Sequence, residues 1–154
     1  DLCGLYLQVL NDLWEKDNGL NDGVAYVSVD LSRAPGDLTA GEQSAIAWIF
    51  ANTHQVEGLS LSHEQLLEQG YLTPVPGMTD TEKGPAPTHW EDGVLFGITP
   101  SSEKQTEQSS LPTLQFNAQK WRSPLGAYFF SNCTATWSQQ GPWESYTVEA
   151  EMIS

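Results

Sequence analysis

The sequence predicts an α+β protein in which N-terminal helices pack on a bent antiparallel sheet that ends in a three-strand meander. Two observations support this fold class. Apolar residues recur with a helical period in much of residues 1–70, whereas residues 113–154 alternate with the period of a strand. Helices that are segregated from a run of hairpins are typical of α+β domains.

A single domain is expected to cover residues 1–154, because this length matches one domain or at most two. The hydrophobic fraction of 39%, with six Trp, five Tyr and five Phe residues, is enough for a packed core. Disorder of the whole chain is therefore excluded.

The N-terminal half contains three predicted helices and one strand. Residues 2–16 place apolar side chains at i, i+3 and i+4 spacing, which is typical of an amphipathic helix. Residues 24–29 are rich in Val and favour a buried strand. Two capping boxes predict further helix starts, Thr39 with Glu42 and Ser62 with Gln65.

Strands and loops are predicted for the rest of the chain. Residues 73–90 are rich in Pro, Gly and Thr, and residues 99–112 are polar, so both segments are expected to be flexible surface loops around a short strand at 93–98. Three long alternating segments follow, joined by turns near 123–126 and 138–142. Strict alternation would place Cys133 on the core side and Phe130 on the opposite side.

Several short segments resemble an uncharacterised group of exported proteins from Gram-positive clostridial bacteria. They are NDLW at 11–14, VSVDLS at 27–32, LTAGE at 38–42 and the hairpin at 128–152. The resemblance implies export and brings no known activity. The strand order also resembles NTF2-like and cystatin-like folds, in which a bent sheet wraps a long N-terminal helix, although here a strand follows the first helix directly.

The charge is strongly negative and unevenly distributed. Twenty acidic and six basic residues give −14, which repels nucleic acid and anionic membrane surfaces. Residues 1–72 carry 11 acidic and 2 basic residues, and residues 113–154 only 3 and 2. No apolar run is long enough for a membrane span. A removed leader and an extracellular or cell-surface-anchored location are expected, because the chain starts at Asp1.

Motifs for catalysis, metals and cofactors are absent from the sequence. It contains no glycine-rich phosphate loop, no nucleophile elbow, no zinc spacing of Cys or His and no complete EF-hand loop, so neither a cofactor nor a metal is expected. The most plausible catalytic pair is His89 with Glu91. These two residues define the alternative function, a small hydrolase or isomerase that uses carboxylate and histidine chemistry in a cleft of the bent sheet.

The favoured function is a non-catalytic, exported binding module for a protein, peptide or carbohydrate. Its surface is predicted on the nearly neutral C-terminal sheet, where aromatic rings and two cations gather. The candidate binding residues are Trp121, Tyr128, Phe130, Trp137, Trp143, Lys120 and Arg122. Two alternatives stay open: the aromatic rings could form a second small core, and Trp137 and Trp143 could stack across a hairpin without any partner.

The two cysteines, Cys3 and Cys133, are compatible with two states. A disulfide between them would close a long loop and stabilise the fold. They could equally be small buried apolar residues.

Overall fold

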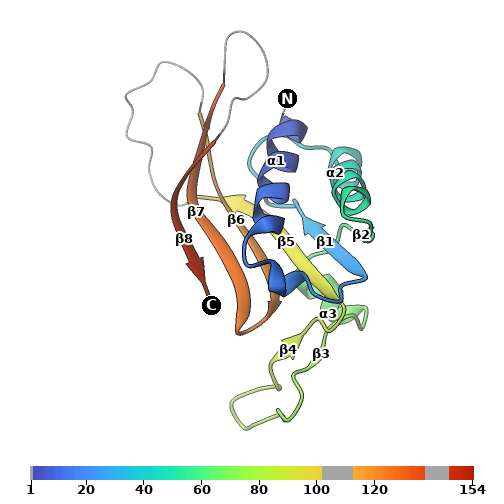
Figure 1. Cartoon of the computed structure of the whole chain (residues 1–154). Coiled ribbons are helices and arrows are strands. Elements are labelled where there is room, and N and C mark those ends of the chain that lie inside the picture. The colour runs from blue at the N-terminus through green and yellow to red at the C-terminus, as the bar shows by residue number, and fades with distance from the viewer. Residues whose placement is uncertain (1, 102–112, 138–145) are drawn as a thin grey trace.

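A curved sheet of six strands forms the centre of the protein, with two helices on one face and a third against the other (Figure 1). The computed structural model describes residues 2–101, 113–137 and 146–154. The helices are α1 (Leu2–Glu15), the 3-10 helix η1 (Asn18–Asn21), α2 (Ala40–Thr53) and α3 (His63–Glu68). The strands of the large sheet are β1 (Tyr26–Asp30), β2 (Glu57–Leu59), β5 (Gly93–Pro100), β6 (Thr113–Ser123), β7 (Gly126–Thr136) and β8 (Thr147–Ile153).

The sheet is mixed, which corrects the wholly antiparallel sheet predicted from the sequence. Its strand order is β2-β1-β5-β6-β7-β8. β1 runs parallel to both β2 and β5, and the remaining neighbours are antiparallel. Between β1 and β2 the chain passes through α2, and such a crossover returns it in its original direction, so the two strands pair in parallel. The helices together with this sheet confirm the predicted α+β class.

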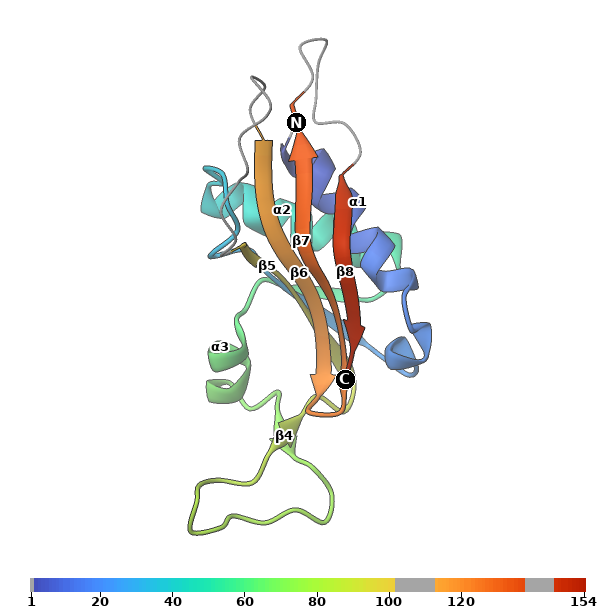
Figure 2. The ribbon, with the colours of Figure 1, turned by 90° about the vertical axis from the view of Figure 1, so that its left-hand side faces the viewer.

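The predicted three-strand meander is present as β6, β7 and β8. The turn between β6 and β7 contains Pro124 and Leu125. Next to this turn, Trp121 of β6 pairs with Ala127 of β7. In Figure 2 the three strands stand in front, and no helix covers the face that they turn to the viewer. The opposite face of the meander lies toward α1.

β7 departs from strict alternation at Asn132, whose backbone is left-handed with a φ of 52°. Phe130 and Cys133 are three apart in β7, yet they pair with residues of β6 that are only two apart. This β-bulge turns both side chains to the same face of the sheet, where they join one core. The prediction that Phe130 lies on the side opposite to Cys133 is therefore wrong, because the bulge shifts the phase of the strand.

Two apolar cores hold the layers together. The larger core lies between the sheet and the pair α1 and α2, and it includes Tyr6, Phe50, Phe96 and Phe116. The smaller core lies on the other face, where Leu66 of α3 packs with Leu72, Trp90 and Leu95.

Both predicted capping boxes are present. Thr39 Oγ1 accepts a hydrogen bond from Glu42 N at 3.1 Å, and Glu42 Oε1 accepts one from Thr39 N at 3.0 Å. Ser62 and Gln65 exchange the equivalent pair at 3.2 and 2.9 Å. Within the described ranges, no helix has both the length and the apolar character that crossing a bilayer requires.

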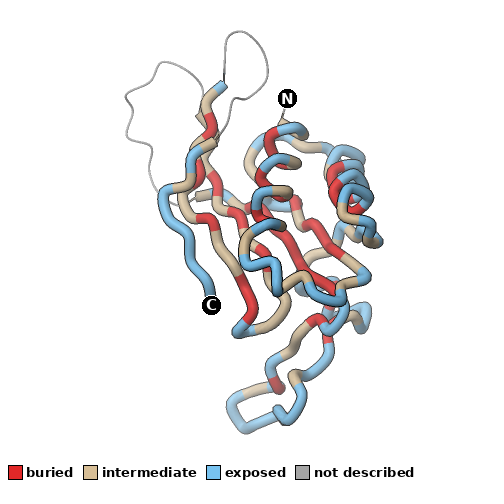
Figure 3. The backbone as a smooth tube through the Cα atoms, viewed as in Figure 1, coloured by how far each residue is buried: buried red, intermediate tan, exposed pale blue. Residues whose placement is uncertain are grey.

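The two predicted loops are partly ordered by strands. In residues 73–90, β3 (Thr73–Pro74) pairs with β4 (Thr88–His89), and most of the residues between them are exposed (Figure 3). In residues 99–112, the first two residues continue β5, and residues 102–112 lie outside the described residues.

Candidate functional site

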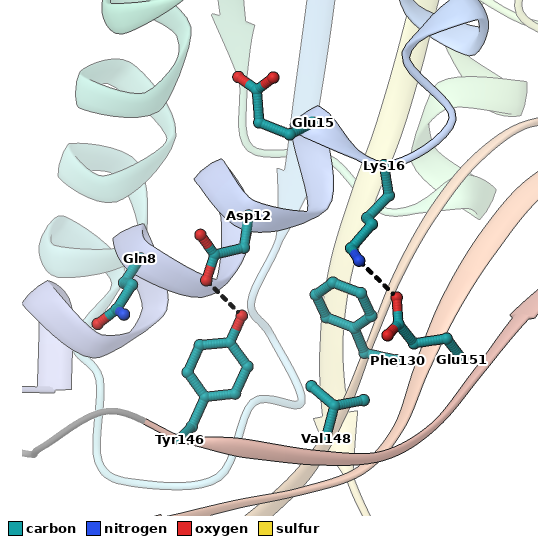
Figure 4. A pocket seen from close by; sticks show the side chains of 8 residues that line it. All are labelled: Gln8, Asp12, Glu15, Lys16, Phe130, Tyr146, Val148 and Glu151. Carbon is teal, nitrogen blue, oxygen red and sulfur yellow. Dashed lines mark hydrogen bonds and ion pairs between the residues drawn. The ribbon is translucent and has the colours of Figure 1, made fainter.

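A cleft of about 410 Å³ lies between α1 and the edge strand β8 (Figure 4). Phe130 and Val148 supply its apolar surface, and the other side chains bring polar or charged ends. The lining residues are Gln8, Asp12, Glu15, Lys16, Phe130, Tyr146, Val148 and Glu151. A concave surface that combines an apolar patch with a few polar groups is typical of ligand sites.

Two polar bridges cross the cleft from α1 to the segment that contains β8. The Tyr146 hydroxyl donates a hydrogen bond to Asp12 Oδ2 at 2.7 Å. Lys16 Nζ lies 3.0 Å from Glu151 Oε1 in an ion pair. Figure 4 shows Phe130 and Val148 between these two bridges. Polar contacts therefore cross the cleft at both ends, and the apolar side chains of Phe130 and Val148 lie between them.

The cleft arises from the helical spacing of two residues of the α1 segment and from the β-bulge in β7. Asp12 and Lys16 are four residues apart, so both lie on the same face of the helical segment. The bulge at Asn132 turns Phe130 toward this face, and Glu151 pairs with Phe130 across β7 and β8. Without the bulge, Phe130 would point away from α1.

The lining of the cleft carries a net negative charge, because it contains three carboxylates and one ammonium group. Hydrogen bonds from Lys16 and from the Tyr128 hydroxyl, the latter at 2.8 Å, lower the pKa of Glu151. Burial, reinforced by the bond to Asp12, raises the pKa of Tyr146 above its ordinary range. At neutral pH Glu151 is thus an anion and Tyr146 a hydrogen-bond donor.

The chemistry of the lining suits binding of a cation. Three of its eight residues, Asp12, Glu15 and Glu151, are carboxylates. An ammonium or guanidinium group would find carboxylate oxygens at the rim and an aromatic ring, Phe130, beside them. Among the residues that the structure describes, no three or more His, Cys, Asp or Glu side chains are grouped to hold a metal ion.

The predicted aromatic residues lie on two faces of the sheet. Tyr128 and Phe130 face α1, and their rings are 6.0 Å apart. Trp121 packs against the smaller core on the other face, with its ring 4.9 Å from that of His63. Only Phe130 of these three lines the cleft.

Lys120 is fully buried, and its ammonium group donates hydrogen bonds to other groups of this chain. Nζ donates to the backbone carbonyl of Trp14 and to Asn21 Oδ1, both at 3.2 Å. Burial lowers the pKa of Lys120 to about 8, against the opposing effects of Asp17 and Glu15. Lys120 therefore joins α1 and η1 to the sheet.

Arg122 binds backbone carbonyls of two separate segments. Nη1 donates to Leu20 O at 2.8 Å and to Asp22 O at 2.6 Å. Nε donates to Trp90 O at 3.2 Å, and Nη2 donates to Glu91 O. The guanidinium group thus ties the turn before β1 to the turn before β5.

The predicted catalytic pair lies outside the cleft. His89 is in β4, where it pairs with Thr73, and it is half-buried. Glu91 is exposed in the turn that leads to β5. The structure brings neither residue to the lining of the α1–β8 cleft.

The predicted tryptophan pair is only partly described. Trp137 follows β7 and is 37% exposed. Trp143 lies outside the described residues. The predicted stacking of these two rings stays a prediction.

The structure does not join the two cysteines by a disulfide. Cys3 Sγ donates a hydrogen bond to Glu42 Oε2 at 3.8 Å. Cys133 is buried, and burial raises the pKa of its thiol to about 12.

The cleft residues Asp12, Lys16 and Tyr146 were missed in the sequence. The spacing of the first two on one helix face was a usable signal. Their meeting with β8 depends on how α1 crosses the sheet, which no local pattern encodes.

Comparison of the chain with protein-family models, curated proteins and solved structures finds no match.

Proposed function

We propose that this protein is a non-catalytic binding module whose α1–β8 cleft receives a cationic group of its ligand. The observation that carries the proposal is the lining of the cleft, to which Asp12, Glu15 and Glu151 contribute carboxylates and Phe130 an aromatic ring. Carboxylates bind ammonium and guanidinium groups by charge-assisted hydrogen bonds, and an aromatic ring adds a cation–π contribution.

The charge of the whole chain supports the same ligand class. A net charge of −14 attracts cations to the surface and repels anions. Lys16 offsets only part of the local charge, because it is already paired with Glu151. A ligand cation can therefore compete with Lys16 for one carboxylate and still meet two others.

The alternative of a hydrolase or isomerase has less support. That mechanism was expected to use His89 and Glu91 in a cleft, and both residues lie outside the lining of the α1–β8 cleft. Lys120 and Arg122 also have less support as ligand-binding residues, because both cations already donate hydrogen bonds to groups of this chain.

An extracellular or cell-surface location is part of the proposal. Charged residues of both signs make up only 17% of the chain. A composition that is polar but has a low fraction of charged residues is common in exported proteins. The resemblance to a group of exported proteins supports the same location.

The test is a calorimetric titration with N-acetyl-arginine amide and with its neutral counterpart, N-acetyl-citrulline amide. The arginine compound is expected to bind and the citrulline compound to bind more weakly or not at all, because only the first carries a positive charge. Glu15→Gln and Glu151→Gln should each weaken the binding about two- to fivefold. Glu57→Gln, at an exposed residue of β2, is the control and should leave it unchanged.

Equal binding of the two compounds would contradict the proposal. The same holds if both cleft variants bind the arginine compound as the unmodified protein does.

A further inference from the structure

We infer that the free edge of β8 is a docking strand for an extended, basic segment of a partner polypeptide, which places one Lys or Arg side chain in the α1–β8 cleft. This inference rests on the function proposed for the cleft. It adds the class of the partner and the mode of attachment, in which the segment becomes a seventh strand of the sheet.

β8 is an edge strand of the sheet. It pairs with β7 along Thr147–Ile153, and no strand pairs with its other edge in the part of the chain that the structure describes. Figures 1 and 2 both place β8 at the border of the sheet. The backbone N–H and C=O groups along such a border are a template for another strand.

The composition of β8 leaves this edge open to a partner. All of its residues except Val148 are exposed (Figure 3), including Met152 at 59% and Ile153 at 63%. Edge strands are commonly protected by charged side chains, especially Lys, by Pro or by a very short length. β8 has seven residues and neither Lys nor Pro, whereas the other edge strand, β2, has only three residues.

The charge of β8 favours a basic partner over a second copy of this chain. Its two ionisable residues are Glu149 and Glu151. Two copies of β8 paired side by side would bring these four carboxylates together, and like charges across a strand pair are destabilising. A segment with Lys or Arg would place opposite charges there instead.

The cleft and the edge are adjacent, so one segment can use both. Glu151 and Val148 belong to β8 and also line the cleft. Side chains of an added strand alternate between the two faces, and those on the α1 side would lie next to Asp12 and Glu15. Backbone pairing would supply affinity without regard to sequence, and the cleft would select the basic side chain.

The experiment uses a synthetic peptide of about nine residues with alternating Thr and Val and one central Arg, a length that matches β8 with a margin at each end. Its comparison peptides carry citrulline or Glu at the centre. Two further peptides are N-methylated at alternate residues, in complementary sets, so that each set blocks the amides along one edge. Binding is measured by calorimetry, and contacts are located by NMR shifts and amide hydrogen exchange.

The Arg peptide is expected to bind at least about tenfold more tightly than N-acetyl-arginine amide. Amides of β8 should become protected from exchange, and one N-methylated set should abolish the gain while the other is tolerated. The citrulline and Glu peptides should bind more weakly than the Arg peptide.

Four outcomes would overturn the inference. Binding of both N-methylated sets as tightly as the parent excludes strand pairing. Protection at Glu57–Leu59 in place of β8 moves the site to the other edge. If N-acetyl-arginine amide binds in the cleft and the peptide gains nothing, the docking strand is refuted while the proposed function stands; if neither binds, both are refuted.

Discussion

At the scale of single residues, Lys120 shows how a charge can be enclosed and still contribute to the fold. Its ammonium group is fully buried and donates to Trp14 O and Asn21 Oδ1. The sequence predicts Lys120 on a strand beside aromatic rings and favours it as a ligand-binding residue. The pattern could not reveal that α1 and η1 would cover it, because that contact joins residues about a hundred positions apart.

The first prediction concerns the pH dependence that Lys120 imposes. Its pKa is about 8 in the folded protein and 10.5 when exposed, so above pH 8 the unfolded chain binds more protons. Stability should therefore rise with pH in this range. Relative to Lys120→Met, the unmodified protein should gain about 1 kcal/mol of unfolding free energy between about pH 8 and pH 9. Urea denaturation at both pH values measures this, and parallel pH profiles would contradict it.

Arg122 gives the second prediction. Lys cannot reproduce the hydrogen bonds that the guanidinium group makes to Leu20, Asp22, Trp90 and Glu91. Arg122→Lys should lower the unfolding free energy by about 2 kcal/mol. The matched control is Arg33→Lys, at an exposed position, which should change it by less than about 0.5 kcal/mol. Urea denaturation compares them, and equal losses would exclude the proposed role of Arg122.

The third prediction concerns the thiols. Titration under denaturing, non-reducing conditions should find two thiols per chain, since the structure has no disulfide. In the native protein Cys133 should react far more slowly than Cys3, because burial raises its thiol pKa to about 12. A chain without reactive thiols before reduction would show that the two residues are bridged.

At the scale of elements, short motifs predict the helix starts correctly, whereas the alternation of residues along β7 does not predict which face each side chain occupies. The capping boxes of α2 and α3 were predicted because each needs only four consecutive residues. The bulge in β7 was not, although Asn is one of the few residues that tolerates the left-handed conformation seen at Asn132. A single extra residue reverses the phase of the side chains before the bulge relative to those after it. Alternation counted through Cys133 without the bulge therefore assigns Phe130 to the wrong face.

The fourth prediction concerns the packing of Trp90 over Gly93 at the start of β5. A Cβ atom added at Gly93 would overlap the indole ring of Trp90, and that ring is fully buried. Gly93→Ala should therefore cost about 2–3 kcal/mol of unfolding free energy. Gly19→Ala, where no atom lies within 4 Å, is the control and should stay within about 0.5 kcal/mol. Tryptophan fluorescence during urea denaturation reports both, and an unchanged Gly93→Ala protein would contradict this packing.

At the scale of the whole molecule, the fold class followed from the order of helices and strands, but the sheet topology did not. The parallel strand β2 has only three residues, too few to show any period. The cleft was equally hidden, because it forms where α1 passes the last strand. Composition did carry information at this scale: the excess of acidic residues favours a basic ligand wherever the site lies.

The most direct test of the central claim is the measurement of intermolecular NOEs between the Arg peptide and the protein. The account predicts NOEs from the methylene protons of the Arg side chain to the rings of Phe130 and Tyr146 and to the methyl groups of Val148, all of which line the cleft. NOEs to Met78 and Leu125, which line an apolar groove of about 440 Å³ elsewhere on the surface, would contradict it.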